Sequence, residues 1–385
     1  MSISYSKENY AFSAIKDKLK PTICTSCRAD GDSFHGHCEE CLRNQAFNKE
    51  YIETHLFIAD KRLRQYHDRD IHPTFKACPY RMPNEKPYLY YGIEIEVSFD
   101  EDYLQVFQSS DDYYDDDNNE PTDDCESMLA EFSEITGGLF IYERDGSLTN
   151  GVEFISRPMS YAQWTNPDTI DKIERGMELL KKWGAFKDQP DTNGMHIHIS
   201  RKFFDYGGGN RVKNSLSGIE KVYQDLDWLF QYYQPELEKI GGRKYTQFCD
   251  SKINKIKERY NLGSRTNRDS LWNVELEVKG KMKKGGRMAR DDHYSAISES
   301  GNTIEARIFN STLDITQIIG NIELMRNFSH AVRNEEITGK TLNNLLHTKD
   351  NKYLDSLLDN VRKRCYKAKE TFDLEKIEAD EMEIK

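Results

Sequence analysis

The residues of this sequence that could carry chemistry are glutamates, histidines and an arginine in short alternating patterns. Successive side chains of an extended strand point to opposite faces, so the glutamates of an E-x-E pattern share one face and the apolar residues share the other. Glutamate and histidine on one face suit divalent cations, and an arginine on a strand suits a phosphate. The patterns lie in four segments, at 92–97 (GIEIEV), 151–156 (GVEFIS), 194–200 (GMHIHIS) and 303–309 (TIEARIF).

Taken singly, each segment also fits an ordinary strand with its polar side in water. Taken together, the four are restricted to E-x-E, H-x-H, E-x-R and a lone glutamate, without the Thr, Lys, Ser and Gln of a typical solvated face. If the strands belong to one sheet, a single face gathers the candidate site residues. These are Glu94, Glu96, Glu153, His196, His198, Glu305 and Arg307.

The composition predicts a globular protein with a polar surface. The chain has 385 residues, of which 37% are hydrophobic, with 22 Tyr and 18 Phe. This length allows two or three domains and a large core. The first twenty residues have no continuous apolar segment like that of a signal peptide, and no segment approaches the length needed to cross a bilayer. We therefore expect a cytoplasmic protein without a membrane partner.

The negative charge is concentrated in one stretch. Residues 100–126 contain twelve Asp or Glu and no Lys or Arg, which equals the net charge of −12 of the whole chain. The simplest interpretation is a solvated insertion after the first strand. A lid or a docking surface for a basic protein is the alternative. Neither interpretation favours nucleic acid as a partner.

Four of the eight cysteines are spaced as zinc ligands. Cys24, Cys27, Cys38 and Cys41 form two C-x-x-C pairs separated by ten residues, the pattern of two knuckles that close on one tetrahedral Zn²⁺. A module of this size would depend on the metal for its stability. We expect a structural or protein-contact role for it.

The apolar periodicity divides the rest of the chain. We expect the zinc module and a linker over residues 1–85, a main domain over 86–335 and a charged helical tail over 336–385. Helical patterns are predicted at 48–70, 166–186, 217–240 and 314–332.

A basic segment precedes the last of the four strands. It includes Lys284, Arg287 and Arg290 next to two glycines. One interpretation is a solvated surface loop. The other is a loop that closes over nucleotide phosphates, to which arginine donates forked hydrogen bonds.

In their order along the chain, the motifs resemble those of the amidoligase family, a group often encoded by bacteriophages. The resemblance covers roughly residues 88–335 and includes neither the cysteine pairs nor the acidic stretch. The matching residues are Gly92, Glu94 and Glu96; Asp145, Gly146, Ser147 and Leu148 with Gly151 and Glu153; Gly194, His196 and His198; and Thr303, Ile304, Glu305 and Arg307.

The resemblance implies an α+β fold like that of glutamine synthetase, with a curved antiparallel sheet and helices on its outer face. It also implies an ATP-dependent joining of a carboxylate to an amine through an acyl phosphate. Two or more Mg²⁺ would be held by Glu94, Glu96, Glu153, one of the two histidines (for which we choose His198) and Glu305. Arg307 would stabilise the phosphoryl oxygens, His196 and His198 would share metal, phosphate and substrate contacts, and Asp145 would bind the amine.

Two other functions stay open. Paired histidines on a strand also occur in zinc-dependent hydrolases, and a binding or structural protein could keep the fold without catalysis. The carboxylate and amine, whether peptides or small molecules, are not specified by the sequence. Neither is a homo-oligomeric state, which relatives by fold often adopt.

Overall fold

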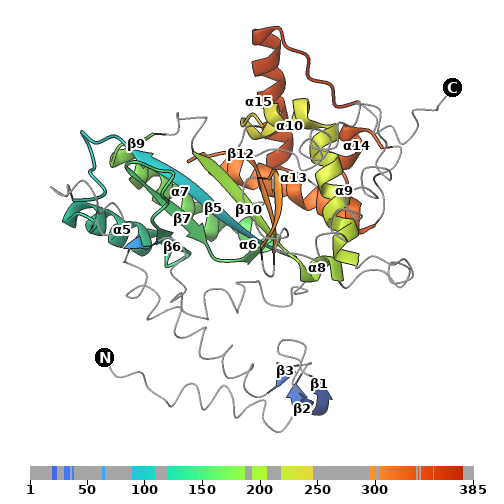
Figure 1. Ribbon diagram of the computed structural model, residues 1–385, viewed down its shortest axis with the longest axis horizontal. Helices are drawn as coiled ribbons and strands as arrows, with labels where there is room; N and C mark the ends of the chain where they lie inside the picture. Colours follow the sequence, from blue (N-terminus) through green and yellow to red (C-terminus); the bar gives the residue numbers. More distant parts are fainter. Residues whose placement is uncertain are drawn as a thin grey trace, which may run out of the picture.

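The computed structural model (Figure 1) describes most of the predicted main domain and the helices after it. The described residues are 20–23, 30–34, 37–38, 63–65, 89–108, 120–186, 193–205, 218–245, 295–300, 303–334, 337, 340–349 and 351–375.

A large mixed sheet positions the candidate residues. Its strands run in the order β11-β12-β10-β5-β7-β6-β4, with β8 and β9 paired to β5. All pairs are antiparallel except β4 with β6. The strands are β4 (Leu63–Arg64), β5 (Tyr90–Phe99), β6 (Phe140–Glu143), β7 (Gly151–Ser156), β8 (Met159–Ser160), β9 (Ala185–Phe186), β10 (Gly194–Ser200), β11 (Ile297–Ser300) and β12 (Thr303–Asn310).

The predicted alternation places the apolar side chains of the central strands in the core. Ile93 and Ile95 of β5 are fully buried, as are Ile197 of β10 and Ile304 of β12. A shift of one residue in any pairing would move these side chains to the opposite face, so their burial helps to fix the register. The glutamates and histidines between them consequently share the other face.

Helices surround the sheet and complete a mixed α/β fold (Figure 1). α5 packs against α7, and α13 packs against α7, α9, α14 and α15. No described helix has the length and apolar character needed to cross a membrane. The helices are α5 (Asp123–Thr136), α6 (Tyr161–Trp164), α7 (Pro167–Lys182), α8 (Lys202–Asp205), α9 (Gly218–Tyr232), α10 (Gln234–Gly241), α13 (Ile315–Arg333), α14 (Leu342–Leu346) and α15 (Tyr353–Ala368).

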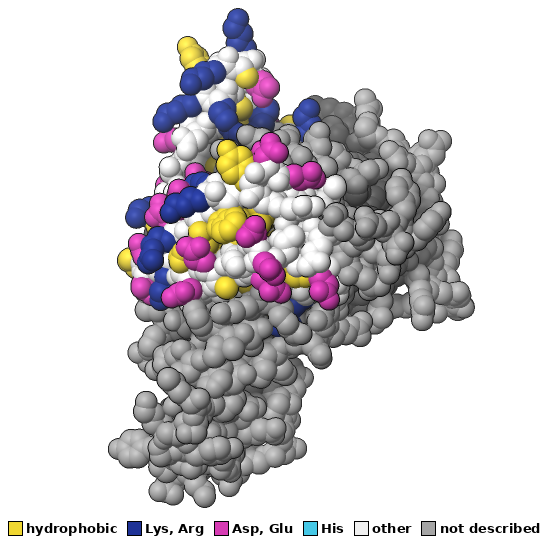
Figure 2. Space-filling model, turned by 90° about the vertical axis from the view of Figure 1, so that its left-hand side faces the viewer, with side chains coloured by type: hydrophobic (Ala, Val, Ile, Leu, Met, Phe, Trp, Pro, Cys, Tyr) yellow, Lys and Arg dark blue, Asp and Glu magenta, His cyan; other side chains and the backbone are white. Residues whose placement is uncertain are grey.

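The outer face of α7 shows how these helices meet solvent. Its buried residues, Ile173, Met177 and Leu180, follow the helical period, and Asn166 caps its first turn. Opposite charges follow one another on its exposed side, for example Lys172 and Asp168, 2.8 Å apart. Figure 2 looks onto the side of the molecule where α5 and α7 lie and shows acidic and basic side chains interspersed.

Three features of the fold differ from the sequence-based expectations. The helix predicted at 48–70 is wrong at Leu63–Arg64, because these residues form β4 and pair with β6. The helical pattern at 217–240 is broken at Tyr233, two residues before Pro235, into α9 and α10. The predicted tail contains α14 and α15, but its leucines at 342, 345, 354 and 358 are buried in the same core as the main domain.

The acidic stretch is not a uniform insertion. Leu104 and Val106 are buried, and Phe107 bridges to Pro121. Asp123, Asp124 and Glu126 form the first turn of α5, where carboxylates interact favourably with the helix dipole. Only the segment 109–119 lies outside the described residues.

The N-terminal region contains three short antiparallel strands, β1 (Lys20–Ile23), β2 (Asp30–Phe34) and β3 (His37–Cys38). Cys38 therefore belongs to β3. Cys24, Cys27 and Cys41 lie outside the described residues, so the zinc site stays a prediction.

Candidate active site

The sheet register brings the four predicted segments together. His196 on β10 lies opposite Glu94 on β5, and Glu96 on β5 lies opposite Glu153 on β7. On the other side of β10, His198 lies opposite Glu305 on β12. All six side chains therefore belong to one face, as the alternation predicts.

His196 is the centre of this face. Its side chain is 4% exposed, and both ring nitrogens point to carboxylates. Nδ1 lies 3.3 Å from Glu94 Oε2 and 3.4 Å from Glu305 Oε1. Nε2 lies 3.5 Å from Glu96 Oε1. A single imidazole thus joins glutamates from two strands.

His198 has a different environment. Its Nε2 lies 3.0 Å from Glu94 Oε1, and its Nδ1 lies 3.1 Å from the hydroxyl of Thr303. Burial alone would lower the pKa of His198, but the charges of Glu94 and Glu305 raise it to about 9. The hydroxyl of Thr303 fixes the orientation of the ring, as groups around metal-binding histidines do.

The same histidines control the ionisation of Glu94. Burial alone would raise its pKa, yet the charge of His198 and hydrogen bonds from His196 and His198 hold the pKa well below the usual range. Glu94 is therefore an anion at neutral pH. Its carboxylate lies near the rings of both His196 and His198.

Glu305 and Arg307 are held side by side on β12. Arg307 Nε lies 2.7 Å from Glu305 Oε1, and the hydroxyl of Ser298 on β11 donates to Glu305 Oε2 at 2.8 Å. Burial would lower the pKa of Arg307, but the charges of Glu305, Glu94 and Glu96 raise it.

Glu153 lies among other carboxylates. It is 5% exposed, and within the described residues its carboxylate has no hydrogen-bond or ion-pair partner. Burial, followed by the charges of Glu94, Asp145, Glu96 and Glu143, raises its pKa well above the usual value. Burial also raises the pKa of Glu96, although His196 and the backbone N–H of Gly194 oppose that effect. A bound cation would compensate the negative charge of both glutamates.

The donor atoms of this face form three overlapping groups, each with its ligand atoms within 4.8 Å of one another. Carboxylate oxygens dominate, which suits Mg²⁺ better than softer metals. Together with the unpartnered carboxylate of Glu153, this donor set fits divalent cations. The groups are Glu94, Glu153 and His196; Glu94, His198 and Glu305; and Glu96, Asp145 and Glu153.

Asp145 belongs to this cluster. It follows β6 and is half-buried, and its Oδ1 accepts the N–H of Ser147 at 2.7 Å. The structure places it beside Glu96 and Glu153. Asp145 therefore adds a further carboxylate to the face. The basic residues Lys284, Arg287 and Arg290 lie outside the described residues.

Two residues near the face were not singled out in the sequence. Glu143 on β6 lies opposite Glu153 and is 5% exposed. It follows three consecutive apolar residues, so this segment has no alternation like that of the other strands that could have marked it. Arg243 follows α10 and is also 5% exposed. No local pattern marks Arg243, because only tertiary packing brings it to the sheet.

Comparison with known proteins supports a family assignment. No curated protein matches the chain. Among solved structures, Plasmodium falciparum glutamine synthetase, determined by cryo-electron microscopy, is similar at a TM-score of 0.32 and 12% identity. The match covers 84% of this chain and 62% of that chain, so less than two thirds of that protein is represented. The family described as "Putative amidoligase enzyme" matches residues 87–329, and the chain therefore belongs to the amidoligase family.

Proposed function

We propose that the protein is an ATP-dependent ligase that joins a carboxylate to an amine on the face formed by β5, β7, β10 and β12. The observation that supports this most strongly is the group of buried and half-buried carboxylates and histidines in three overlapping ligand sets. Membership of the amidoligase family agrees with it. The abundance of carboxylates favours a magnesium-dependent phosphoryl transfer over zinc-dependent hydrolysis.

The proposed reaction has two steps. A carboxylate is a poor electrophile because attack on it must expel an oxide. An oxygen of the substrate carboxylate therefore attacks the γ-phosphorus of ATP, ADP leaves, and an acyl phosphate forms. The nitrogen of the amine then attacks the carbonyl carbon, inorganic phosphate leaves, and the nitrogen loses a proton to give the amide.

The chain's own residues would hold and orient these groups. Glu94, Glu96, Glu153, His198 and Glu305 would bind Mg²⁺, which when bound neutralises charge on the phosphoryl oxygens. Arg307 would donate to the transferring phosphoryl group from its place beside Glu305.

Three further roles complete the proposal. His196, surrounded by Glu94, Glu96 and Glu305, would fix these carboxylates relative to one another. Asp145, at the Glu153 side of the face, would bind the substrate amine. The basic segment with Lys284, Arg287 and Arg290 would cover the nucleotide phosphates.

Calorimetric titration with a non-hydrolysable ATP analogue tests the proposal. We expect binding that requires Mg²⁺ in the wild-type protein and at least about tenfold weaker binding in Glu94→Gln, because that substitution removes the carboxylate shared by two ligand sets. Glu178→Gln, at an exposed ion pair on α7, is the matched control and should bind as the wild type does.

The outcomes separate the alternatives. Magnesium-dependent binding that is lost only in Glu94→Gln supports the ligase and justifies screening pairs of carboxylates and amines for ADP release. A wild-type protein that binds no nucleotide with or without Mg²⁺ would favour the non-catalytic alternative.

A further inference from the structure

Arg243 is delivered to the sheet by a turn that requires two glycines. Gly242 ends α10 with φ 75° and bridges to Phe309 of β12. A Cβ on Gly241 would lie 2.3 Å from the carbonyl oxygen of Ile308. These close approaches bring the next residue, Arg243, over the sheet, where its Nη1 donates to the carbonyl oxygen of Arg307 at 3.2 Å.

The guanidinium of Arg243 occupies the space where a side chain at position 194 would begin. A Cβ on Gly194 would lie 2.1 Å from Arg243 Nη1 and 2.8 Å from its Cζ. The φ angle of Gly194 is not in the left-handed region, so space and not backbone conformation requires glycine there. The N–H of Gly194 also donates to Glu96 Oε2. Gly194, the motif glycine before the two histidines, thus makes room for an arginine beside the face that carries the glutamates and histidines.

The charge of Arg243 acts on Glu96, whose pKa it lowers, but Arg243 forms no ion pair with a described carboxylate. It is 5% exposed, and among the residues that the structure describes no carboxylate lies within ion-pair distance of its guanidinium. In contrast, Arg307 forms an ion pair, with its Nε 2.7 Å from Glu305 Oε1. Burying a charge without a directly bonded counter-ion is costly, and an arginine cannot lose its proton to avoid that cost. A guanidinium with free donors is suited to forked binding of a carboxylate or phosphate.

We propose that Arg243 is the receptor for an oxyanion of the substrates, held at the Gly194 end of β10 next to the metal face. The oxyanion is either the carboxylate to be activated or a phosphoryl group of the nucleotide. The inference rests on the proposed function, because it assigns the ligand of that same site.

Anion-dependent stability tests this assignment directly. The melting temperature of the wild-type protein is measured against increasing inorganic phosphate and, separately, acetate, since a ligand that binds only the folded state raises it. We expect Arg243→Ala to weaken the response to at least one anion by about 10- to 100-fold in affinity. Arg243→Lys, which keeps the charge and loses the fork, should be intermediate and also serves if the alanine variant fails to fold. Arg175→Ala, at an exposed arginine of α7, should respond as the wild type does.

Calorimetry with the non-hydrolysable ATP analogue and Mg²⁺ identifies the source of the oxyanion. Weaker nucleotide binding in Arg243→Ala assigns a phosphoryl group to Arg243. Unchanged nucleotide binding together with a lost acetate response assigns the substrate carboxylate. Unchanged responses to phosphate, acetate and nucleotide in both Arg243 variants would overturn the proposal, and so would a wild-type protein that responds to none of them.

A double-mutant cycle with Gly194→Ala tests the geometry. In the wild-type background the new Cβ must displace the guanidinium, so stability and the anion response should both fall. In the Arg243→Ala background the space is empty, and the same change should cost much less stability. Gly92→Ala on the adjacent strand, whose Cβ would meet its nearest neighbour at 3.7 Å, should show no dependence on Arg243. Equal costs of Gly194→Ala in both backgrounds would contradict the proposed placement.

These results are distinguishable from a failure of the proposed function. If the wild-type protein binds no nucleotide but responds to acetate or phosphate through Arg243, the ligase assignment fails and the oxyanion receptor stands. If nucleotide binding depends on Glu94 while both Arg243 variants behave as the wild type does, the ligase assignment stands and the receptor role fails.

Discussion

Glu153, on the sheet face that carries the glutamates and histidines, is held in an environment that is unfavourable for its negative charge. The side chain is buried among carboxylates from β5 and β6, and its pKa is raised well above the usual value. At neutral pH the folded protein must either keep a proton on Glu153 or bear the repulsion of its charge, whereas the unfolded chain ionises it freely. This loss of stability grows as the pH rises above the pKa of an unfolded glutamate, about 4.3.

Replacement of Glu153 by Gln should therefore separate stability from function. We expect the melting temperature of metal-free Glu153→Gln at pH 7–8 to be higher than that of the wild type by a few degrees, since ~1 kcal/mol corresponds to about 2–4 °C in domains of 150–250 residues. The additional stabilisation by Mg²⁺ should be lost. Differential scanning calorimetry with and without Mg²⁺ measures both effects. A metal-free variant that melts below the wild type would show that the carboxylate is not under strain.

The sequence predicts which residues form the site and which face they share. It does not predict the residues that lie close to the site only in the folded structure. Alternation places Glu94 on the polar face of its own strand, and likewise His196 and Glu305, because the period of a strand is fixed by local geometry. That these faces coincide follows from the pairing of β5, β10 and β12. Arg243 could not be found in this way. Its position depends on the approach of α10 to β12 and on the missing side chain of Gly194, which are tertiary features.

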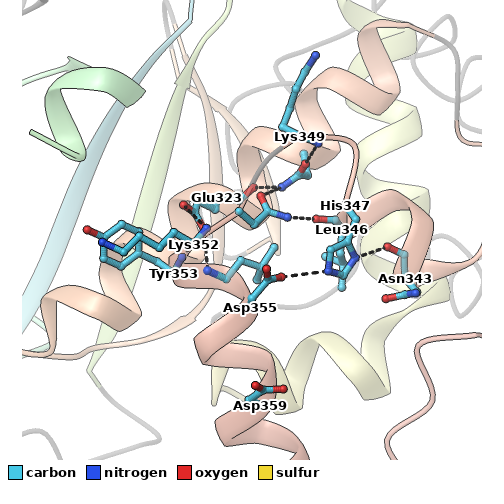
Figure 3. A network of polar contacts seen from close by, with 12 residues as sticks. Glu323, Asn343, Leu346, His347, Lys349, Lys352, Tyr353, Asp355 and Asp359 are labelled. Atoms are coloured by element: carbon cyan, nitrogen blue, oxygen red, sulfur yellow. Dashed lines mark hydrogen bonds and ion pairs between the residues drawn. The ribbon is translucent and has the colours of Figure 1, made fainter.

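At the scale of elements, a buried glutamate connects three helices. Glu323 of α13 is fully buried and accepts the N–H groups of Tyr353 at 2.9 Å and Leu354 at 2.6 Å, in the first turn of α15. It also accepts the hydroxyl of Tyr161 on α6 at 2.6 Å. Lys352, at the start of α15, provides no side-chain cap, so Glu323 satisfies these donors from another helix (Figure 3).

We expect Glu323→Gln to lower the free energy of unfolding by about 1–3 kcal/mol, because an amide replaces a charged acceptor facing several donors. Amide hydrogen exchange should be faster at Tyr353 and Leu354 than in the wild type. Glu131→Gln, on the exposed side of α5, is the control and should change neither quantity. If exchange in α15 were unaltered, the glutamate would not be what holds this helix end.

Helices could be predicted where one side of the helix is apolar over several turns. α7 and α13 lie where the helical period places them, because their buried stripes are continuous in the sequence. β4 was not predictable. Its two residues become a strand only by pairing with β6, and local propensity carries no information about such a distant partner.

At the scale of the whole molecule, the structure extends beyond the residues that match the family. The match ends at 329, yet α14 and α15 contribute buried leucines to the same hydrophobic core. At the other end, Arg64 of β4 accepts the N–H of Arg144 through its carbonyl at 2.8 Å. Segments on both sides of the family domain are therefore part of its packing, and the predicted boundary at 335 does not separate two cores.

His330 lies where α13 meets the segment after α14. Its ring packs edge-on against Phe203, with ring centroids 5.0 Å apart. Burial, followed by the charges of Lys349, Arg326 and Arg333, lowers the pKa of His330 to about 4. The unfolded chain has no such constraint, and its histidine titrates near 6.5.

The stability of the protein should therefore fall as the pH decreases from about 6.5 towards 4, because in this range the unfolded state binds a proton that the folded state excludes. His330→Gln removes this contribution, so the difference in unfolding free energy between wild type and variant should change across that range and be constant above pH 7.5. Urea unfolding at a series of pH values measures the difference and cancels the titrations that both proteins share. A difference that does not vary with pH would show that His330 is protonated equally in both states, and the three surrounding cations would then not act on it.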